Sequence, residues 1–147
     1  MEKDIIGKKP GWMYRQSGVI PFLIDEGKLK VVLITSTSTG SWVFPKGVVE
    51  KNMTEIDSAL KEGKEEAGIS GIAFPKEVGE YEYEKWSGKC IVKMFAMNVK
   101  EISEDWLEMD DRKRAIVEIE KAKEMIENPK LIDLLEKGKK EFDINVK

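Results

Sequence analysis

The sequence predicts one α+β domain in which a mixed β-sheet is sandwiched between helices. Its 147 residues suit a single compact domain, residues 1–147, with a core of its own. Apolar residues make up 41% of the chain and charged residues 36%, which is typical of a globular protein with a heavily charged surface. The order of hydrophobic patterns is hairpin, helix, strands and then helices, and this mixed order favours a layered α+β architecture.

The first half of the chain predicts a hairpin followed by a helix. Residues 16–35 contain two runs rich in β-branched residues on either side of the turn sequence DEGK. Residues 36–41 predict a loop, and WVF a short extended piece that ends at Pro45. Thr54 and Asp57 resemble a capping box, and Gly68 stands where a helix should end. We therefore expect a helix from about Glu55 to Ala67.

The second half predicts two long strands, a loop and two helices. Residues 72–86 and 89–102 alternate or run apolar and should form antiparallel strands. Residues 101–114 are expected to form a functional loop anchored by Trp106 and Leu107. Residues 115–142 predict two helices separated at Asn128 and Pro129. These helices either cover the sheet or make a homodimer contact.

The composition excludes several classes of function. The chain has no histidine, which excludes Ser-His-Asp and Cys-His catalysis, and its one cysteine, Cys90, lies in an apolar run typical of a buried thiol. Any metal ligands must be mostly oxygens, which favours magnesium, manganese or calcium. The net charge of -3 provides no general attraction for nucleic acid, and no apolar run is long enough for a membrane span. Residues 1–10 have no export signal, so we expect a cytoplasmic protein.

The predicted helix has two distinct faces. At about 100° per residue, one stripe is apolar or small and should face the core. Gly63 lies inside that stripe, which indicates close approach to another backbone. On another side stand Glu62, Glu65 and Glu66, spaced so that their like charges repel. Two interpretations remain open, namely a solvated helix face or a face that binds a cation such as Mg²⁺. The core stripe consists of Ile56, Ala59, Leu60, Gly63 and Ala67.

The segment GVVEKNMTEIDSALKEGKEEAGI is similar to the signature of the Nudix hydrolases. That signature runs Gly, five residues, Glu, seven residues, Arg-Glu, an aliphatic, any residue, Glu-Glu, any residue, Gly, an aliphatic. The preceding WVFPKG also resembles the family. Two positions depart from the pattern, because Met53 replaces the first glutamate and Lys61 the arginine, a pair that braces the loop and helix in the family. The matching positions are Gly47, Glu62, Glu65, Glu66, Gly68 and Ile69.

The resemblance implies the Nudix fold and a metal-dependent pyrophosphohydrolase, with Mg²⁺ or Mn²⁺ as cofactor. Its small-molecule substrate would be a nucleoside diphosphate linked to a further group. Glu62, Glu65 and Glu66 would hold the metal and carry the catalysis, with a backbone carbonyl around Lys46 and Gly47 as a further ligand. The general base would be one of the three glutamates or an acid of a later loop. The later-loop candidates are Glu101, Glu104 and Asp105.

Residues 100–126 resemble the Nudix branch that cleaves diadenosine and diphosphoinositol polyphosphates, so diadenosine tetraphosphate is the expected type of substrate. The basic run Arg112, Lys113 and Arg114 would bind phosphate, or else it begins a solvated helix. Lys46 is a second phosphate contact, and Trp42 would either stack on a base or belong to the core. The alternatives are a catalytically silent Nudix module that binds nucleotides, or a hydrolase of a nucleotide sugar or an RNA 5′ end.

Overall fold

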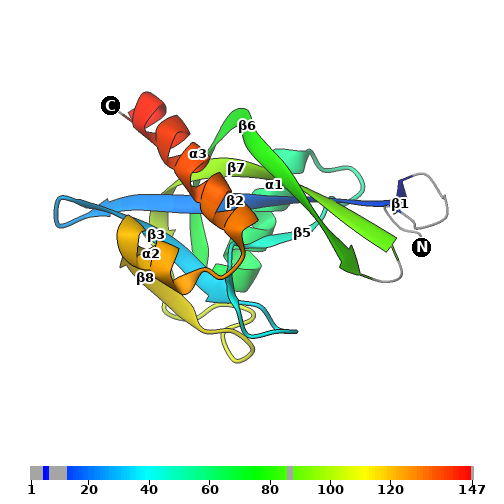
Figure 1. Cartoon of the computed structure of the whole chain (residues 1–147), viewed down its shortest axis with the longest axis horizontal. Helices are drawn as coiled ribbons and strands as arrows, with labels where there is room; N and C mark the ends of the chain where they lie inside the picture. The colour runs from blue at the N-terminus through cyan, green and yellow to red at the C-terminus, as the bar shows by residue number, and fades with distance from the viewer. Residues whose placement is uncertain (1–4, 7–12, 86–87, 147) are drawn as a thin grey trace.

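A single mixed sheet forms the centre of the molecule (Figure 1). The computed structural model describes residues 5–6, 13–85 and 88–146. Within these residues eight strands pair in one sheet whose main order is β4-β3-β2-β7-β6, while β1 and β5 pair with β2 and β8 with β3. β2 and β7 are parallel, and every other pair is antiparallel. The strands are β1 (Ile5–Ile6), β2 (Met13–Asp25), β3 (Lys28–Thr35), β4 (Trp42–Val43), β5 (Lys46–Val48), β6 (Ile69–Lys85), β7 (Gly88–Ile102) and β8 (Arg114–Glu118).

Helices cover both faces of this sheet, as the sequence predicted. In Figure 1, α3 crosses the near face and α1 lies behind the sheet. Because side chains alternate along a strand, Ile20 and Phe22 of β2 pack into the cluster under α2 and α3, whereas Val19 packs into the cluster under α1. The sheet is therefore buried on both sides. The helical elements are α1 (Glu55–Glu62), a single π-helical turn η1 (Gly63–Ala67), α2 (Ile119–Met125) and α3 (Pro129–Val146).

The predicted hairpin is present, and its first strand begins three residues earlier than expected. β2 and β3 pair antiparallel and are joined at Glu26 and Gly27, which have φ of 54° and 77°. Two successive residues with positive φ match the twist of a two-residue hairpin turn, and glycine adopts this conformation without a steric penalty.

The predicted helix from Glu55 to Ala67 is also present. The Thr54 side chain caps it by accepting a hydrogen bond from the Asp57 backbone N–H at 3.0 Å, and Gly68 ends it with φ of 69°. Two details differ from the expectation. The last five residues form the wider turn η1, and a Cβ atom at Gly63 would first meet the side chains of Val19 and Ile69 and not the backbone of another element.

The prediction for the segment after residue 114 was partly wrong. Residues 115–118 are not the start of a helix but belong to β8, which pairs antiparallel with β3 between Lys30 and Ile34. Residues 115–118 have a helical sequence pattern, but they form a strand because they can hydrogen-bond to the edge of β3, which is distant in the sequence. The two helices do follow, and Pro129 is the first residue of α3, where its missing N–H carries no penalty. Of the two roles considered for the tail, α3 covers the sheet, while a homodimer contact stays a prediction.

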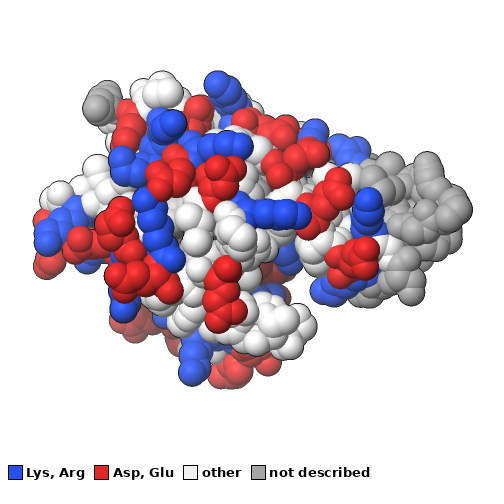
Figure 2. Space-filling model, viewed as in Figure 1, with Lys and Arg blue, Asp and Glu red and all other residues white. Residues whose placement is uncertain are grey.

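The surface and the ends add little that constrains function. Figure 2 shows positive and negative side chains interspersed over the visible face, without a large area of one sign. No helix within the described ranges is long and apolar enough to cross a membrane. Residues 1–4 and 7–10 of the segment expected to lack an export signal lie outside the described residues.

Replacing Phe142 with alanine tests the contribution of α3 to stability. Phe142 is 2% exposed and packs on Phe22 and Phe74, with ring centroids 5.3 and 6.2 Å away. We expect Phe142→Ala to lower the free energy of unfolding by about 3 to 5 kcal/mol in denaturant titrations, because it leaves a cavity. Ile144 on the same helix is 74% exposed, so Ile144→Ala serves as control and should change stability by less than about 0.5 kcal/mol. Equal effects would contradict this packing.

Candidate active site

A large hollow lies where the end of α1 and η1 meets the segment around strand β5. It has a volume of about 940 Å³. Its rim carries the hydroxyl groups of residues 36–39 and Ser41, and Trp42, Tyr81 and Tyr83 contribute aromatic surface. The charged groups Lys46, Glu62, Glu66 and Arg112 also line it.

Two of the predicted glutamates meet in this cavity. Glu62 and Glu66 are four residues apart and so lie on successive turns of α1 and η1. The Glu66 carboxylate accepts a hydrogen bond from the Lys46 backbone N–H at 3.1 Å and lies 3.3 Å from Nη2 of Arg112. A Cβ atom at Gly47 would lie 2.2 Å from the carboxyl carbon of Glu62. Glycine is therefore required at residue 47 for the Glu62 carboxylate to rest on the backbone.

Burial raises the pKa of both carboxyl groups. Burial, followed by the charge of Glu66, raises the pKa of Glu62 to about 8. Burial also raises the pKa of Glu66, although Arg112 and Lys46 oppose that shift. Paired, desolvated carboxylates are stabilised by a bound cation, which replaces the protons they would otherwise retain. Two carboxylates beside the Lys46–Gly47 backbone form an all-oxygen donor set, which fits a hard divalent cation such as Mg²⁺.

The third glutamate, Glu65, is paired with a lysine. Its carboxylate forms an ion pair with Nζ of Lys61 at 2.7 Å, and the same Nζ lies 3.0 Å from Glu50. The hydrogen bonds to Glu65 and then to Glu50 raise the pKa of Lys61. Across the residues with described positions, no three acidic side chains stand close enough together to hold a metal ion. The structure thus assembles two of the three predicted metal ligands, and the third is paired with a lysine.

The loop between β7 and β8 holds the end of η1 in place. The backbone N–H of Glu108 donates to the carbonyl of Glu65 at 3.1 Å, and Nε1 of Trp106 donates to the carbonyl of Glu66 at 3.0 Å. Nη1 of Arg114 donates to the carbonyl of Ala67 at 2.8 Å, and its guanidinium stacks 3.9 Å from the Trp106 ring centre. Carbonyls that a helix end leaves without partners are thereby satisfied.

This loop confirms Trp106 as an anchor, whereas the expectation for Leu107 was wrong. Leu107 is 74% exposed. The helix-start interpretation of the basic run was also wrong, because residues 112–113 precede a strand. The three basic side chains do not form one patch on the cavity. Arg112 lines the cavity, but it also donates to Glu108 at 2.7 Å and to the Thr35 carbonyl at 3.0 Å.

Comparisons with known proteins show the family to which this chain belongs. A model of the NUDIX domain matches residues 14–135, which is most of the chain. The chain belongs to the Nudix family. It is 36% identical over 110 residues to the mitochondrial Nudix hydrolase 13 of Arabidopsis thaliana, an alignment that covers 68% of this chain and 54% of that protein. The chain thus spans about half the length of this curated relative.

Solved structures share the Nudix fold. The Ap4A hydrolase of C. elegans superposes with a TM-score of 0.70 at 23% identity, covering 85% of this chain and 95% of that one. The NUDIX domain of Shewanella oneidensis NrtR, crystallised with ADP ribose, gives a TM-score of 0.71 at 11% identity and covers 88% of both chains. At these identities the likeness shows the shared fold.

Of the remaining predicted substrate-binding residues, Lys46 and Trp42 line the cavity of this Nudix domain, and Lys113 does not. Lys46 lines it, with Nζ 4.7 Å from the centre of the Tyr83 ring, and burial lowers its pKa. Trp42 both lines the cavity and packs against the core, so both interpretations of this residue describe part of its surroundings. Lys113 is exposed, and its backbone N–H donates to Oγ1 of Thr35 at 2.9 Å.

Sequence reasoning missed several residues that line the cavity. Gln16 is 4% exposed, and its Oε1 accepts a hydrogen bond from the Tyr83 hydroxyl at 2.8 Å. The alternation EYEYE at residues 80–84 could have identified Tyr81 and Tyr83, since a period of two places both on one face of a strand. The acids that line the cavity besides Glu62 and Glu66 are Glu84 and Glu127. Glu101, Glu104 and Asp105 are not among the lining residues.

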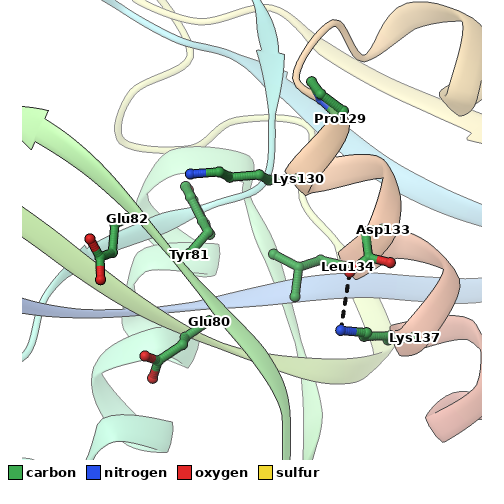
Figure 3. A pocket seen from close by; sticks show the side chains of 8 residues that line it. All are labelled: Glu80, Tyr81, Glu82, Pro129, Lys130, Asp133, Leu134 and Lys137. Atoms are coloured by element: carbon green, nitrogen blue, oxygen red, sulfur yellow. Dashed lines mark ion pairs between the residues drawn. The ribbon is translucent and has the colours of Figure 1, made fainter.

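A second hollow, of about 530 Å³, lies between β6 and α3 (Figure 3). It shares Tyr81 and Pro129 with the larger cavity. Figure 3 shows Tyr81 extending toward Lys130, and an ion pair between Asp133 and Lys137 along α3. No pair of carboxylates comparable with Glu62 and Glu66 converges in the view, so we place the chemistry in the larger cavity.

The raised pKa of Glu62 predicts how stability depends on pH without metal. The folded-state pKa of about 8 exceeds the ordinary glutamate value of 4.5, so ionising Glu62 destabilises the fold increasingly between pH 4.5 and 8. We expect Glu62→Gln, in the presence of a chelator, to raise the thermal midpoint at pH 9 by about 3 to 6 °C and to leave it nearly unchanged at pH 4.5. Calorimetric scans at both pH values measure this, and a gain confined to pH 4.5 would contradict the assignment.

Proposed function

We propose that this domain is a metal-dependent hydrolase of a nucleoside diphosphate linked to a further group, with a dinucleoside polyphosphate such as diadenosine tetraphosphate as its preferred substrate. One observation carries the proposal. Glu62 and Glu66 face each other beside the backbone of Gly47 and line a cavity large enough for a nucleotide. Mg²⁺ is the proposed cofactor, and Mn²⁺ has the same ligand preferences.

The proposed metal site consists of Glu62, Glu66 and a backbone carbonyl around Lys46 and Gly47, joined by Glu65 once it leaves Lys61. When bound, the ion neutralises phosphate oxygens and lowers the pKa of the attacking water. The cavity contains positive charge for the polyphosphate at Lys46, and Arg112 adds charge beside Glu66.

The proposed reaction is a direct hydrolysis. The oxygen of a water molecule forms a new bond to phosphorus, the bond from that phosphorus to the bridging oxygen breaks, and the bridging oxygen leaves with the other phosphate. A carboxylate that lines the cavity accepts the proton of the water. Phosphoryl transfer depends on positioning and charge neutralisation, so it needs neither the histidine that this chain lacks nor a covalent intermediate.

The shape and lining of the cavity support a nucleotide polyphosphate. Its volume lies near the upper end of the range for small-molecule sites. Trp42 and Tyr83 offer aromatic surface for a base, and the hydroxyl groups of residues 36–39 offer hydrogen bonds to ribose or phosphate. The shared fold with the C. elegans Ap4A hydrolase supports the same substrate type.

A second candidate function is nucleotide binding without turnover. It is favoured by the ion pair that holds Glu65 on Lys61 and by Met53 in place of the glutamate of the Nudix signature. The ADP ribose in the Shewanella oneidensis NrtR structure supports a nucleotide as ligand in this case too. Turnover of about 1 s⁻¹ or more on any tested compound would exclude this alternative.

Glutamine variants of the paired carboxylates test the proposed hydrolysis. We expect Glu62→Gln and Glu66→Gln each to lower kcat with Mg²⁺ by about 100-fold or more, because each removes a negative ligand without changing side-chain size. Product formation from diadenosine tetraphosphate, ADP ribose, a nucleotide sugar and a 5′-capped RNA is followed by chromatography. The control is Glu124→Gln, which removes an exposed carboxylate of α2 that pairs with Lys121 and should retain full activity. Full activity in the Glu62→Gln/Glu66→Gln protein would refute the proposal.

A further inference from the structure

The lysine that holds Glu65 has a second carboxylate partner. Nζ of Lys61 lies 2.7 Å from Glu65 and 3.0 Å from Glu50, and these are its ion-pair partners among the described side chains. Glu65 belongs to the same helical segment as Lys61, four residues on, whereas Glu50 belongs to the loop after β5. The ammonium group therefore bridges the loop and the helix.

Hydrogen bonds of its backbone N–H and carbonyl groups fix the position of Glu50 in the loop. Its N–H donates to Oγ of Ser58 at 3.0 Å, and Ser58 is fully buried in the first half of α1. Its carbonyl accepts a hydrogen bond from the N–H of Met53 at 3.1 Å, which closes the turn of residues 50–53. Asn52 in this turn has a φ of 65°. The Glu50 carboxylate is thus presented to Lys61 from a backbone that is attached to the helix.

The second ion pair, between Lys61 and Glu50, determines whether Lys61 keeps a carboxylate partner when Glu65 moves. Glu65 can join Glu62 and Glu66 only if its carboxylate leaves the ammonium group. With Glu50 present, Lys61 keeps one carboxylate partner throughout. Without Glu50, the departure of Glu65 would separate the one ion pair left to Lys61 among the described side chains, and the lysine would hold Glu65 more tightly. The side chains of Lys61, Glu50 and Glu65 are partly exposed to solvent, which weakens their ion pairs. Loss of Glu50 should therefore weaken the release of Glu65 without abolishing it.

We infer that Glu50 is a positioning residue that, by holding Lys61 from the loop, allows Glu65 to leave its ion pair and complete the metal site with Glu62 and Glu66. The inference rests on the proposed function. It also accounts for Met53, since Glu50 supplies an acid at the other end of the same turn. The Lys61–Glu65 ion pair then keeps Glu65 out of the metal site, and Glu50 determines how strong that ion pair is.

Binding of Mn²⁺, measured by calorimetry on the full chain, tests this role without relying on turnover. We expect Glu50→Gln to weaken Mn²⁺ binding by about tenfold, the lower end of the range for residues that orient metal ligands. Adding Met53→Glu to Glu50→Gln should recover most of the loss, because it restores an acid to the same turn. Glu124→Gln is the matched control and should bind Mn²⁺ like the unaltered protein.

A double-mutant cycle shows whether Glu50 acts through Lys61. In a Lys61→Gln background, Glu50→Gln should have no further effect on the Kd for Mn²⁺. Continued weakening there, or a lowered thermal midpoint with unchanged Mn²⁺ affinity, would overturn the inference. Unaltered protein that binds Mn²⁺ but hydrolyses nothing refutes the proposed hydrolysis while leaving the role of Glu50 standing. If the unaltered protein hydrolyses a substrate and Glu50→Gln binds Mn²⁺ with the same affinity, the role of Glu50 is refuted and the proposed hydrolysis stands. A protein that binds no Mn²⁺ refutes both proposals.

Discussion

The apposition of two desolvated carboxylates on successive helical turns is the constraint on which the rest of the site depends. Glu62 and Glu66 repel each other and have lost much of their hydration, so this end of the helix opposes folding unless its surroundings are rigid. The rigidity comes from the packing of the sheet between two helical layers. Gly47 is part of the same constraint, because a side chain there would displace the Glu62 carboxylate.

The glycine that ends the helix connects this constraint to a distant loop. Gly68 has a positive φ, and a Cβ atom there would lie 2.9 Å from both Cβ of Trp106 and Nη1 of Arg114. These two residues donate hydrogen bonds to the carbonyls of Glu66 and Ala67. The same small residue therefore permits both the reversal of the chain and the close contact of the loop that fixes η1. Arg112, from the end of that loop, reaches the Glu66 carboxylate itself.

Local signals in the sequence predicted the hairpin, the capped helix and the long antiparallel strands, and they pointed to Glu62 and Glu66, which line the cavity, whereas Glu65 pairs with Lys61. Each of these elements is marked by a pattern within its own stretch of sequence, such as the capping pair Thr54 and Asp57. The strand β8 could not be found in this way, because its partner β3 lies some 80 residues earlier in the chain. The separate roles of Arg112 and Arg114 also arise only when the loop meets η1. Glu50 is an intermediate case, since an acid near Met53 was visible in the sequence but its contact with Lys61 was not.

The attachment of the β7–β8 loop to the backbone of η1 has a consequence for how such domains diversify. The carbonyls of residues 65–67 are bound by donors that lie outside the family signature. Insertions or substitutions between residues 103 and 113 could therefore shift the glutamates by fractions of an ångström while every signature residue stays the same. Two proteins with identical signatures would then act on different compounds. The length of this loop and its hydrogen-bond donors would predict the substrate better than the signature does.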